Sequence, residues 1–319
     1  MAERSTALAR HSTLTVRVAA YNVLAQCLAK SSYFTFASKP VLKWANRSKA
    51  LASLVPGLGD IICLSEVDYV PHWRETLEPE FVLLHQLRGT KQYGTAIAFR
   101  RTHFRLVDAA ACNFDDVAEV AGASAELFKR SCVAVFAALQ PLPPPAAAFP
   151  LPPLLIVVST HLFWDPSLPA VRAAQAGMLQ LCLADFTSRA RALPGCGGVG
   201  PLIVAGDLNS LPGSVAHRML TQLPIIAPLA GTKAPDAWSS GWDLLGMDGE
   251  GASGFPVRPP APDRAPCSFA RAAWLSEVAI RLPEWLKHAA RRSSSAPEPH
   301  KDRGGFIRRR LSPQCFRVA

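Results

Sequence analysis

The sequence predicts an α/β (α+β) fold in which β-sheets pack on each other and helices cover the outside. Apolar runs suited to strands occur in pairs, and helical patterns separate only some of these pairs. This arrangement fits neither strict βαβ alternation nor an all-β chain. Of the 319 residues, 49% are hydrophobic and 18% are charged, which favours a globular chain with a sizeable core.

Seven apolar segments are predicted as strands, and three segments with helical spacing are predicted as helices. Between two of the strands, residues 141–153 are rich in Pro and Ala, which favours an exposed hairpin connection. The predicted strands are 14–20, 60–64, 81–84, 94–99, 130–139, 154–159 and 202–205, and the predicted helices are 44–55, 170–190 and about 215–223.

The net charge of +10 is concentrated near the end of the chain. Residues 264–319 hold 12 Lys or Arg and 4 Asp or Glu, so the preceding part is close to neutral. A basic character therefore says little about the partners of the main domain. We expect a short N-terminal extension over 1–13, a domain over 14–230 that is incomplete at its C-terminal end, and a divergent, disordered Arg-, Pro- and Ala-rich tail over 231–319.

No apolar run is long enough to span a membrane, and the N-terminus lacks the apolar core of a signal peptide. The eight cysteines are scattered without metal-ligand spacing, as is typical of core residues in a reducing compartment. We therefore expect no membrane partner and a cytoplasmic location, with the nucleus or an organelle as alternatives. No leucine-rich repeat precedes the first strand, and the oligomeric state stays open.

Polar residues follow four of the predicted strands: Asn22, Glu66, His161, and the pair Asp207 and Asn209. Each residue alone fits a cap, a turn or a solvated side chain equally well or better. Together they offer a carboxylate for a hard divalent cation, a second carboxylate as a base for water, and donors for a phosphoryl group. This combination predicts a phosphoesterase site.

These residues lie within a larger set of motifs that resembles the endonuclease/exonuclease/phosphatase superfamily, and within it the branch of CCR4-type deadenylases, nocturnin and Angel proteins. The motifs extend over about two-thirds of the chain, and THLFWDP together with GDLNS is the most specific part. In chain order they are YNVLAQ (21–26), WANR (44–47), DIICLSEVD (60–68), GTAIAFRR (94–101), NFDDVA (113–118), FKRS (128–131), THLFWDP (160–166) and GDLNSLPGS (206–214).

The resemblance implies a four-layer α/β/β/α arrangement, with two sheets forming a β-sandwich flanked by helices. It also implies that Glu66 holds Mg²⁺, or alternatively Mn²⁺, with Asn22 beside it. His161 would contact the scissile phosphate, Asp207 would orient or deprotonate the attacking water, and Asn209 would stabilise the transition state.

On the substrate side, the resemblance implies that Trp164, Asp165 and Pro166 shape the nucleotide side of the cleft. Arg130 matches a position near the substrate. One minor departure is Ser65, which precedes Glu66 where the wider family often has Gln.

The C-terminal motifs of the family are missing. Neither the strand with an Asp-Tyr motif nor the Ser-Asp-His motif occurs after Leu223, so we expect the C-terminal strands to be lost or replaced. Two explanations are open: a divergent extension, or a reading frame that leaves the family's frame near Gly231. Loss of core strands would expose an edge of a sheet.

The leading hypothesis is a Mg²⁺-dependent phosphodiester hydrolase, namely a 3′-to-5′ exoribonuclease whose partner is RNA with a poly(A) 3′ end. A phosphatase of a small nucleotide such as NADP is an alternative, because the same groups serve a phosphomonoester. A catalytically dead, RNA-binding family member is a second alternative, because the terminal motif is absent.

Overall fold

The computed structural model describes residues 15–120, 128–142, 152–194, 197–221 and 238–240. Nine strands and five α-helices lie in these residues. The strands are β1 Val18–Asn22, β2 Ile61–Val67, β3 Phe81–Leu87, β4 Gly94–Arg100, β5 Phe104–Asn113, β6 Val133–Pro141, β7 Leu154–His161, β8 Val199–Asp207 and β9 Trp238–Ser240; the helices are α1 Trp44–Leu54, α2 Val70–Leu77, α3 Phe114–Val120, α4 Pro169–Arg191 and α5 Val215–Thr221.

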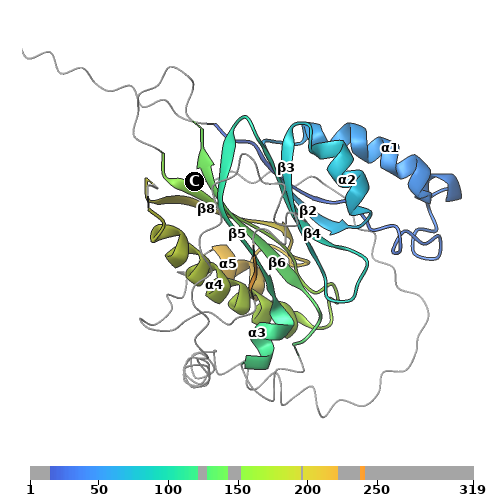
Figure 1. Cartoon of the computed structure of the whole chain (residues 1–319). Helices are drawn as coiled ribbons and strands as arrows, with labels where there is room; N and C mark the ends of the chain where they lie inside the picture. Colours follow the sequence, from blue (N-terminus) through green and yellow to red (C-terminus); the bar gives the residue numbers. More distant parts are fainter. Residues whose placement is uncertain (1–14, 121–127, 143–151, 195–196, 222–237, 241–319) are drawn as a thin grey trace, which may run out of the picture.

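The strands form two mixed sheets that face each other, with helices on both outer faces (Figure 1). The first sheet has the order β1-β2-β4-β3 and is covered by α1 and α2, while the second has the order β8-β7-β6-β5-β9 and is covered by α3, α4 and α5. The predicted α/β/β/α sandwich is therefore confirmed. In the part of the chain that the structure describes, no helix is long and apolar enough to cross a membrane.

Three apolar layers hold the sandwich together, because alternate residues of a strand face opposite sides of its sheet. In β2, Ile61 and Cys63 pack between the two sheets, whereas Ile62 and Leu64 pack against α1 and α2. On the far side of the second sheet, Phe136 packs against Phe186 of α4. Both sheets are therefore buried on two faces, which explains the nearly continuous apolar runs in the sequence.

The middle layer ends in polar side chains at one rim. Ala20, Val157 and Ala205 lie in this layer between the sheets. Continuing their face by two or four residues leads to Asn22, His161 and Asp207, the last residues of β1, β7 and β8. Asp207 lies 3.2 Å from Nδ2 of Asn22 and 3.9 Å from Nε2 of His161, so these strand ends meet at one edge of the sandwich.

Several elements differ from the sequence-based predictions. The strand β5, and the helices α2 and α3, were not predicted, and β1 ends at Asn22 rather than at Ala20. The β5 segment is rich in Ala and contains Arg105 and Asp108, so its local strand propensity is weak. Its strand conformation comes from antiparallel pairing with β6 along almost its whole length.

The described part of the C-terminal region is a short strand. Residues Trp238–Ser240 of β9 pair antiparallel with Ala110–Cys112 of β5, at the edge of the second sheet. This strand lies inside the range 231–319 that we predicted as a tail. The remaining predictions about that range lie outside the described residues. The predicted N-terminal extension and most of the predicted hairpin connection lie outside them as well.

Gly206, one residue before Asp207, tests how the rim is built. Its φ is 125°, and a Cβ there would lie 2.0 Å from the carbonyl oxygen of Thr160 in β7. We expect Gly206→Ala to lower the free energy of unfolding by about 2 kcal/mol or more, because it adds both strain and a clash with backbone. Urea denaturation measures this difference.

Gly57→Ala is the matched control for that substitution, because nothing lies within 4 Å of a Cβ at Gly57. We expect the control to change the free energy of unfolding by less than about 0.5 kcal/mol. Equal effects of the two substitutions would contradict the role assigned to Gly206.

Candidate functional site

A side-chain amide joins two carboxylates at the rim of the sandwich. The Nδ2 of Asn22 donates to Oε1 of Glu66 at 2.8 Å and lies 3.2 Å from Oδ2 of Asp207. The Oδ1 of Asn22 accepts the backbone N–H of Leu24 at 2.9 Å, which fixes the orientation of the amide. Because Asn22 and Glu66 belong to the first sheet and Asp207 to the second, this amide links the two sheets at the predicted site.

Glu66 reaches the rim through a β-bulge. Ser65 pairs with Thr95 and Val67 pairs with Gly94, so Glu66 has no partner residue in β4, and its φ is 60°. Val67 packs with the apolar residues under α1 and α2, on the face that strict alternation would give to Glu66. The bulge therefore turns the carboxylate of Glu66 towards Asn22, a use of bulges that is common near functional sites.

The carboxylate of Asp207 is held from several sides. Its Oδ1 accepts the backbone N–H of Asn209 at 2.9 Å, and its Oδ2 lies 3.9 Å from Nε2 of His161. The side chain of Asn209 donates through Nδ2 to the carbonyl of Leu162 at 2.9 Å, so Asn209 braces the residue after His161. Asp207 remains partly exposed and can therefore meet a water molecule or a substrate.

His161 is buried at the rim. Burial lowers its pKa, and the carboxylates of Asp207 and Glu66 partly oppose that shift, while Arg88 reinforces it. The imidazole is consequently neutral at pH 7 and can donate or accept a single hydrogen bond at Nε2.

The loop after β1 binds the carboxylates of Glu66 and Asp68 and so helps to hold Glu66 at the rim. The backbone N–H of Ala25 donates to Oε2 of Glu66 at 3.1 Å, and that of Gln26 donates to the buried Asp68. Arg47, on α1, donates to the carbonyls of Val23 and Leu24 and to the side chain of Gln26. Burial raises the pKa of Asp68. These contacts hold the loop that carries the hydrogen bond to Glu66.

Arg130 lies beside the loop that follows His161. Its guanidinium lies over the ring of Phe163, with 5.1 Å between Cζ and the ring centroid. The carboxylate of Asp115 accepts the backbone N–H groups of Arg130 and Ser131 at 2.7 and 2.8 Å. The sequence motifs 113–118 and 128–131 are thus joined, and together they place a cation next to the candidate site.

The other predicted substrate residues lie on the loop between β7 and α4. Trp164 is 62% exposed, and Pro166 is exposed as well. The Oδ1 of Asp165 accepts the N–H and the hydroxyl of Ser167 at 2.8 and 2.7 Å, so this carboxylate shapes the loop before α4. The substrate roles of these three residues stay predictions.

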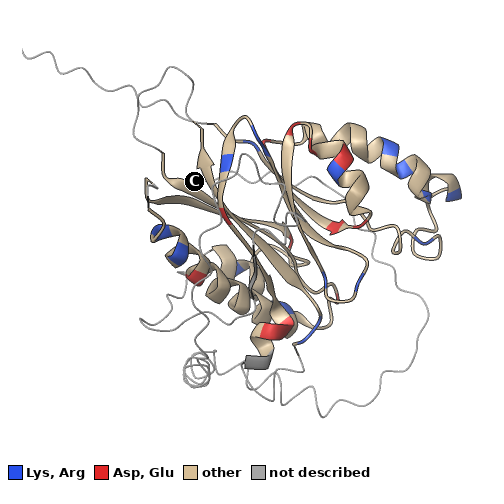
Figure 2. Cartoon of the chain, in the orientation of Figure 1, with Lys and Arg blue, Asp and Glu red and all other residues tan. Residues whose placement is uncertain are grey.

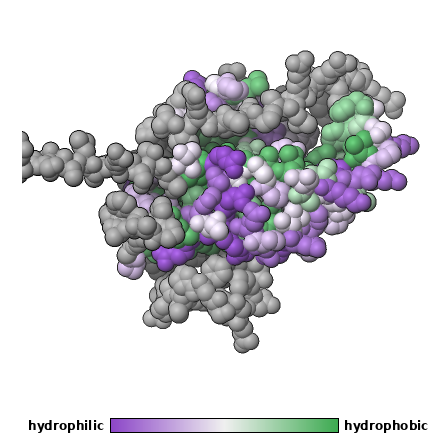
Figure 3. Space-filling model, turned by 90° about the horizontal axis from the view of Figure 1, so that it is seen from above, coloured by the Kyte–Doolittle hydropathy of each residue, from purple (hydrophilic) through white to green (hydrophobic). Residues whose placement is uncertain are grey.

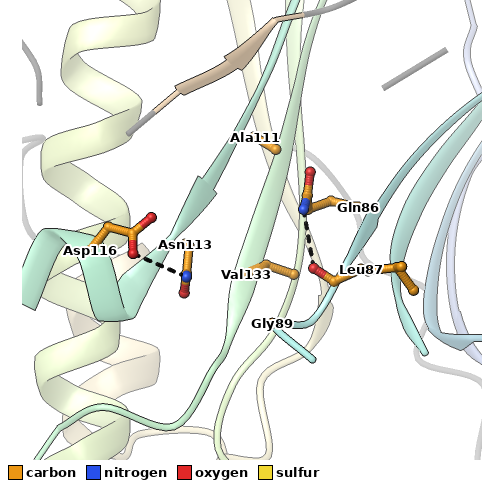
Figure 4. Close-up of a pocket in the computed structure, with 7 residues that line it drawn as sticks. All are labelled: Gln86, Leu87, Gly89, Ala111, Asn113, Asp116 and Val133. Atoms are coloured by element: carbon orange, nitrogen blue, oxygen red, sulfur yellow. Dashed lines mark hydrogen bonds between the residues drawn. The ribbon is translucent and has the colours of Figure 1, made fainter. Parts of the chain in front are cut away.

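A pocket of about 160 Å³ lies beside Gly89, which is close to Ser131 (Figure 4). We call residues 128–131 the Arg130 turn. Asn113 and Asp116 are joined on one side of it, where Asn113 also accepts the N–H of Asp115 at the start of α3. Across the pocket, the amide of Gln86 donates to the carbonyl of Leu87. These polar groups therefore bind neighbouring protein groups, and the carboxylates of the candidate site lie elsewhere.

The donor set at the rim fits Mg²⁺. No group of three or more His, Cys, Asp or Glu side chains suited to a metal ion occurs in the described residues. Mg²⁺ is commonly held by one or two carboxylates, while waters and substrate phosphates complete its coordination. Glu66 and, nearby, Asp207 supply carboxylate oxygens of this kind, and the Nδ2 of Asn22 holds the two carboxylates in place.

Three supporting residues were not found by reading the sequence: Asp115, Arg88 and Arg47. Arg88 is buried and donates to the carbonyls of Arg130 and Ser131 and to Sγ of Cys132, at 3.0, 3.2 and 3.1 Å. Only Arg47 and Asp115 had a sequence signal, since both lie in motifs that we had matched. Arg88 lies outside every motif, so only its burial reveals it.

Replacing Arg88 tests whether this buried guanidinium holds the Arg130 turn. In Arg88→Met two partly buried carbonyls and the buried thiol of Cys132 lose their donor, and we expect the free energy of unfolding to fall by about 2 kcal/mol. Urea denaturation of both proteins measures the difference. The control Arg101→Met removes an exposed guanidinium and should cost less than about 1 kcal/mol. Equal losses would contradict a special role for Arg88.

Replacing His85 tests how burial affects a titratable group near Glu66. The Nε2 of His85 lies 3.4 Å from the carbonyl of Val67, the residue after Glu66. Burial lowers the pKa of His85 to about 4 from an ordinary value of 6.5. Below pH 6.5 the unfolded chain binds a proton that the folded chain does not, so stability falls as the pH drops from 6.5 towards 4.

We therefore expect His85→Gln to flatten the loss of unfolding free energy between pH 7.5 and pH 5, as measured by urea denaturation at several pH values. His161 is present in both proteins, so its contribution cancels in the comparison. An unchanged pH dependence would contradict the burial of a neutral His85.

The comparisons with known proteins agree with this fold. The profile described as the Endonuclease/Exonuclease/phosphatase family matches residues 19–269. The Carbon catabolite repressor protein 4 homolog 4 of Arabidopsis thaliana is 28% identical over 242 residues, which cover 66% of this chain and 56% of that protein. Protein angel homolog 1 of Rattus norvegicus is 32% identical over 214 residues, covering 63% of this chain and 30% of that protein.

Among solved structures, ANGEL2, which is described as a 2′,3′-cyclic phosphatase in complex with adenosine-2′,3′-vanadate, superposes with a TM-score of 0.50 and 27% identity, covering 64% of this chain and 56% of that one. The chain thus spans roughly a third to just over half of the length of these curated relatives. The match of the family profile over most of the chain, on a sandwich that gathers the expected polar residues, shows that this chain belongs to the endonuclease/exonuclease/phosphatase family.

Proposed function

We propose that this protein is a divalent-metal-dependent phosphodiesterase that acts at the 3′ end of RNA, as a 3′-to-5′ exoribonuclease with poly(A) as substrate. One observation carries the proposal: a single amide of Asn22 holds the carboxylates of Glu66 and Asp207 together, with the neutral His161 beside them. Membership of a family of phosphoester hydrolases supports it. The similarity to ANGEL2, described as a 2′,3′-cyclic phosphatase in complex with adenosine-2′,3′-vanadate, supports a nucleotide substrate.

Glu66 would hold the cation, Mg²⁺ or Mn²⁺, with Asn22 beside it, and the cation when bound would supply Lewis-acid activation of the phosphate oxygens. The carboxylate of Glu66 is oriented by Asn22 and by the N–H of Ala25, so it is placed before any ligand arrives. A preorganised ligand of this kind avoids reorganisation during the reaction.

Asp207 would act as the base that orients and deprotonates the attacking water. Its carboxylate is partly exposed, and its orientation is fixed by the backbone N–H of Asn209. His161, neutral and close to Asp207, can hydrogen-bond a phosphate oxygen, while Asn209 adds an amide donor. Arg130 and the exposed ring of Trp164 would contact the RNA next to the cleaved bond.

A second candidate reaction is hydrolysis of a 2′,3′-cyclic phosphate at an RNA 3′ end. It is favoured by the similarity to ANGEL2, which carries that description. Dephosphorylation of a small nucleotide such as NADP and binding of RNA without catalysis are the remaining candidates, the latter because the sequence lacks the Ser-Asp-His motif.

Hydrolysis of 5′-labelled oligo(A) with Mg²⁺ by the full chain tests the proposal. We expect a ladder shortened from the 3′ end, abolished by a chelator, and a rate at least about 100-fold lower in Asp207→Asn and in Glu66→Gln. Asp185→Asn is the matched control, because it removes a carboxylate on α4 that pairs with Arg189 away from the rim. We expect this control to retain the full rate.

Parallel assays separate the candidates. Loss of the terminal cyclic phosphate without a ladder would select the second candidate, and orthophosphate released only from NADP would select the nucleotide phosphatase. A folded chain that binds oligo(A) but cleaves none of the three substrates would contradict the proposed activity.

A further inference from the structure

The segment after the candidate site is basic and contains exposed aromatic residues. We call residues 27–44 the basic aromatic arm. No Asp or Glu occurs between residues 23 and 59, a stretch that contains Lys30, Lys39, Lys43, Arg47 and Lys49. The helix α1 at the end of the arm likewise shows Lys and Arg but no acidic residue (Figure 2). The arm and α1 themselves therefore offer a polyanion only positive charge, although the neighbouring α2 carries Glu75.

Exposed aromatic side chains lie among these lysines, and the ammonium of Lys30 lies over the ring of Tyr33. Phe36 is 86% exposed and Tyr33 is 52% exposed. The ring of Trp44 stacks on Tyr69 with 4.6 Å between centroids, and Tyr69 is itself 51% exposed. Figure 3, in which the α1 side lies at the right, shows hydrophobic and hydrophilic side chains next to one another at this end. Exposed rings that alternate with cations are typical of surfaces on which bases stack.

Hydrogen bonds fix the shape of the arm, so its aromatic rings are held in exposed positions. The side chain of Gln26 donates to the carbonyl of Leu42 at 3.0 Å, which ties the two ends of the arm together. Asn46 of α1 donates to the carbonyl of Pro40 at 2.8 Å. Backbone hydrogen bonds close turns at Tyr33 and Phe34 as well. Prior ordering of this kind lowers the entropic cost of binding.

The arm is continuous with the candidate site. It starts directly after Ala25 and Gln26, whose backbone N–H groups bind Glu66 and Asp68. Tyr69, which stacks on Trp44, comes three residues after Glu66. A strand of RNA with its cleaved phosphate at Glu66 can thus extend onto the arm.

We propose that the basic aromatic arm is a second contact surface for single-stranded RNA, which binds nucleotides beyond the cleaved bond by stacking on Tyr33, Phe36 and Tyr69 and by phosphate contacts to its lysines. The inference rests on the proposed function for the identity of the ligand. The arm makes binding depend on the length of the RNA, whereas the residues at the rim carry out the hydrolysis.

The test is binding of fluorescein-labelled single-stranded oligo(A) of about 20 nucleotides by the full chain in a chelator, so that no hydrolysis is needed. Each of Tyr33→Ala and Phe36→Ala should weaken binding about fivefold or more, since a stacked base contributes at least that factor. Lys39→Glu with Lys43→Glu should weaken binding further and reduce its salt dependence. Arg101→Glu with Arg105→Glu, an equal charge change on exposed residues near the opposite ends of the strands, should leave it unchanged.

Hydrolysis of a dinucleotide, which is too short to reach the arm, should keep its rate in the arm variants. Weaker binding of the long oligonucleotide in the arm variants alone supports the inference, even if the chain cleaves nothing and the proposed function fails. Unchanged binding in folded arm variants overturns it. So does an arm that binds anionic lipid vesicles in preference to RNA.

Discussion

The side-chain amide of Asn22 is the contact on which the candidate site depends. Asn22 is the last residue of β1, and its amide nitrogen lies within hydrogen-bond distance of a carboxylate of each sheet. The apolar layer between the sheets sets the distance across which it must reach, because that layer fixes how closely the sheets approach. The packing between the sheets therefore sets the geometry of the rim, and changes in that packing change the separation of Glu66 and Asp207.

Strained backbone is concentrated around this rim. Five described residues other than glycine have a left-handed backbone, and all of them lie in or beside the segments that build the site and its supports. Such conformations cost free energy and persist where the surrounding structure enforces them. Arg47 donates to the carbonyl of Leu24, and Ser131 is held by Asp115 and Arg88, so these contacts stabilise two of the five residues. The five residues are Leu24, Glu66, Tyr69, Ser131 and Asn209.

Much of the sandwich could be predicted from the sequence, because strands buried on both faces leave continuous apolar runs. Alternation along these runs also places Asn22, His161 and Asp207 on one face. Glu66 is different: alternation directs it to the helix-covered face, and only a bulge, which no local pattern announced, brings it to the rim. The strand β5 was missed for a related reason, since its Ala-rich sequence becomes a strand through pairing with β6 rather than through propensity.

The location of a bound cation tests the candidate site most directly. In crystals of the full chain grown with Mn²⁺ and AMP, anomalous scattering shows where the cation lies. We expect a peak within coordination distance of a carboxylate oxygen of Glu66, next to Asn22 and Asp207, and loss of that peak in Glu66→Gln. A peak at another place, or an unchanged peak in the variant, would contradict the assignment of this rim as the phosphodiesterase centre.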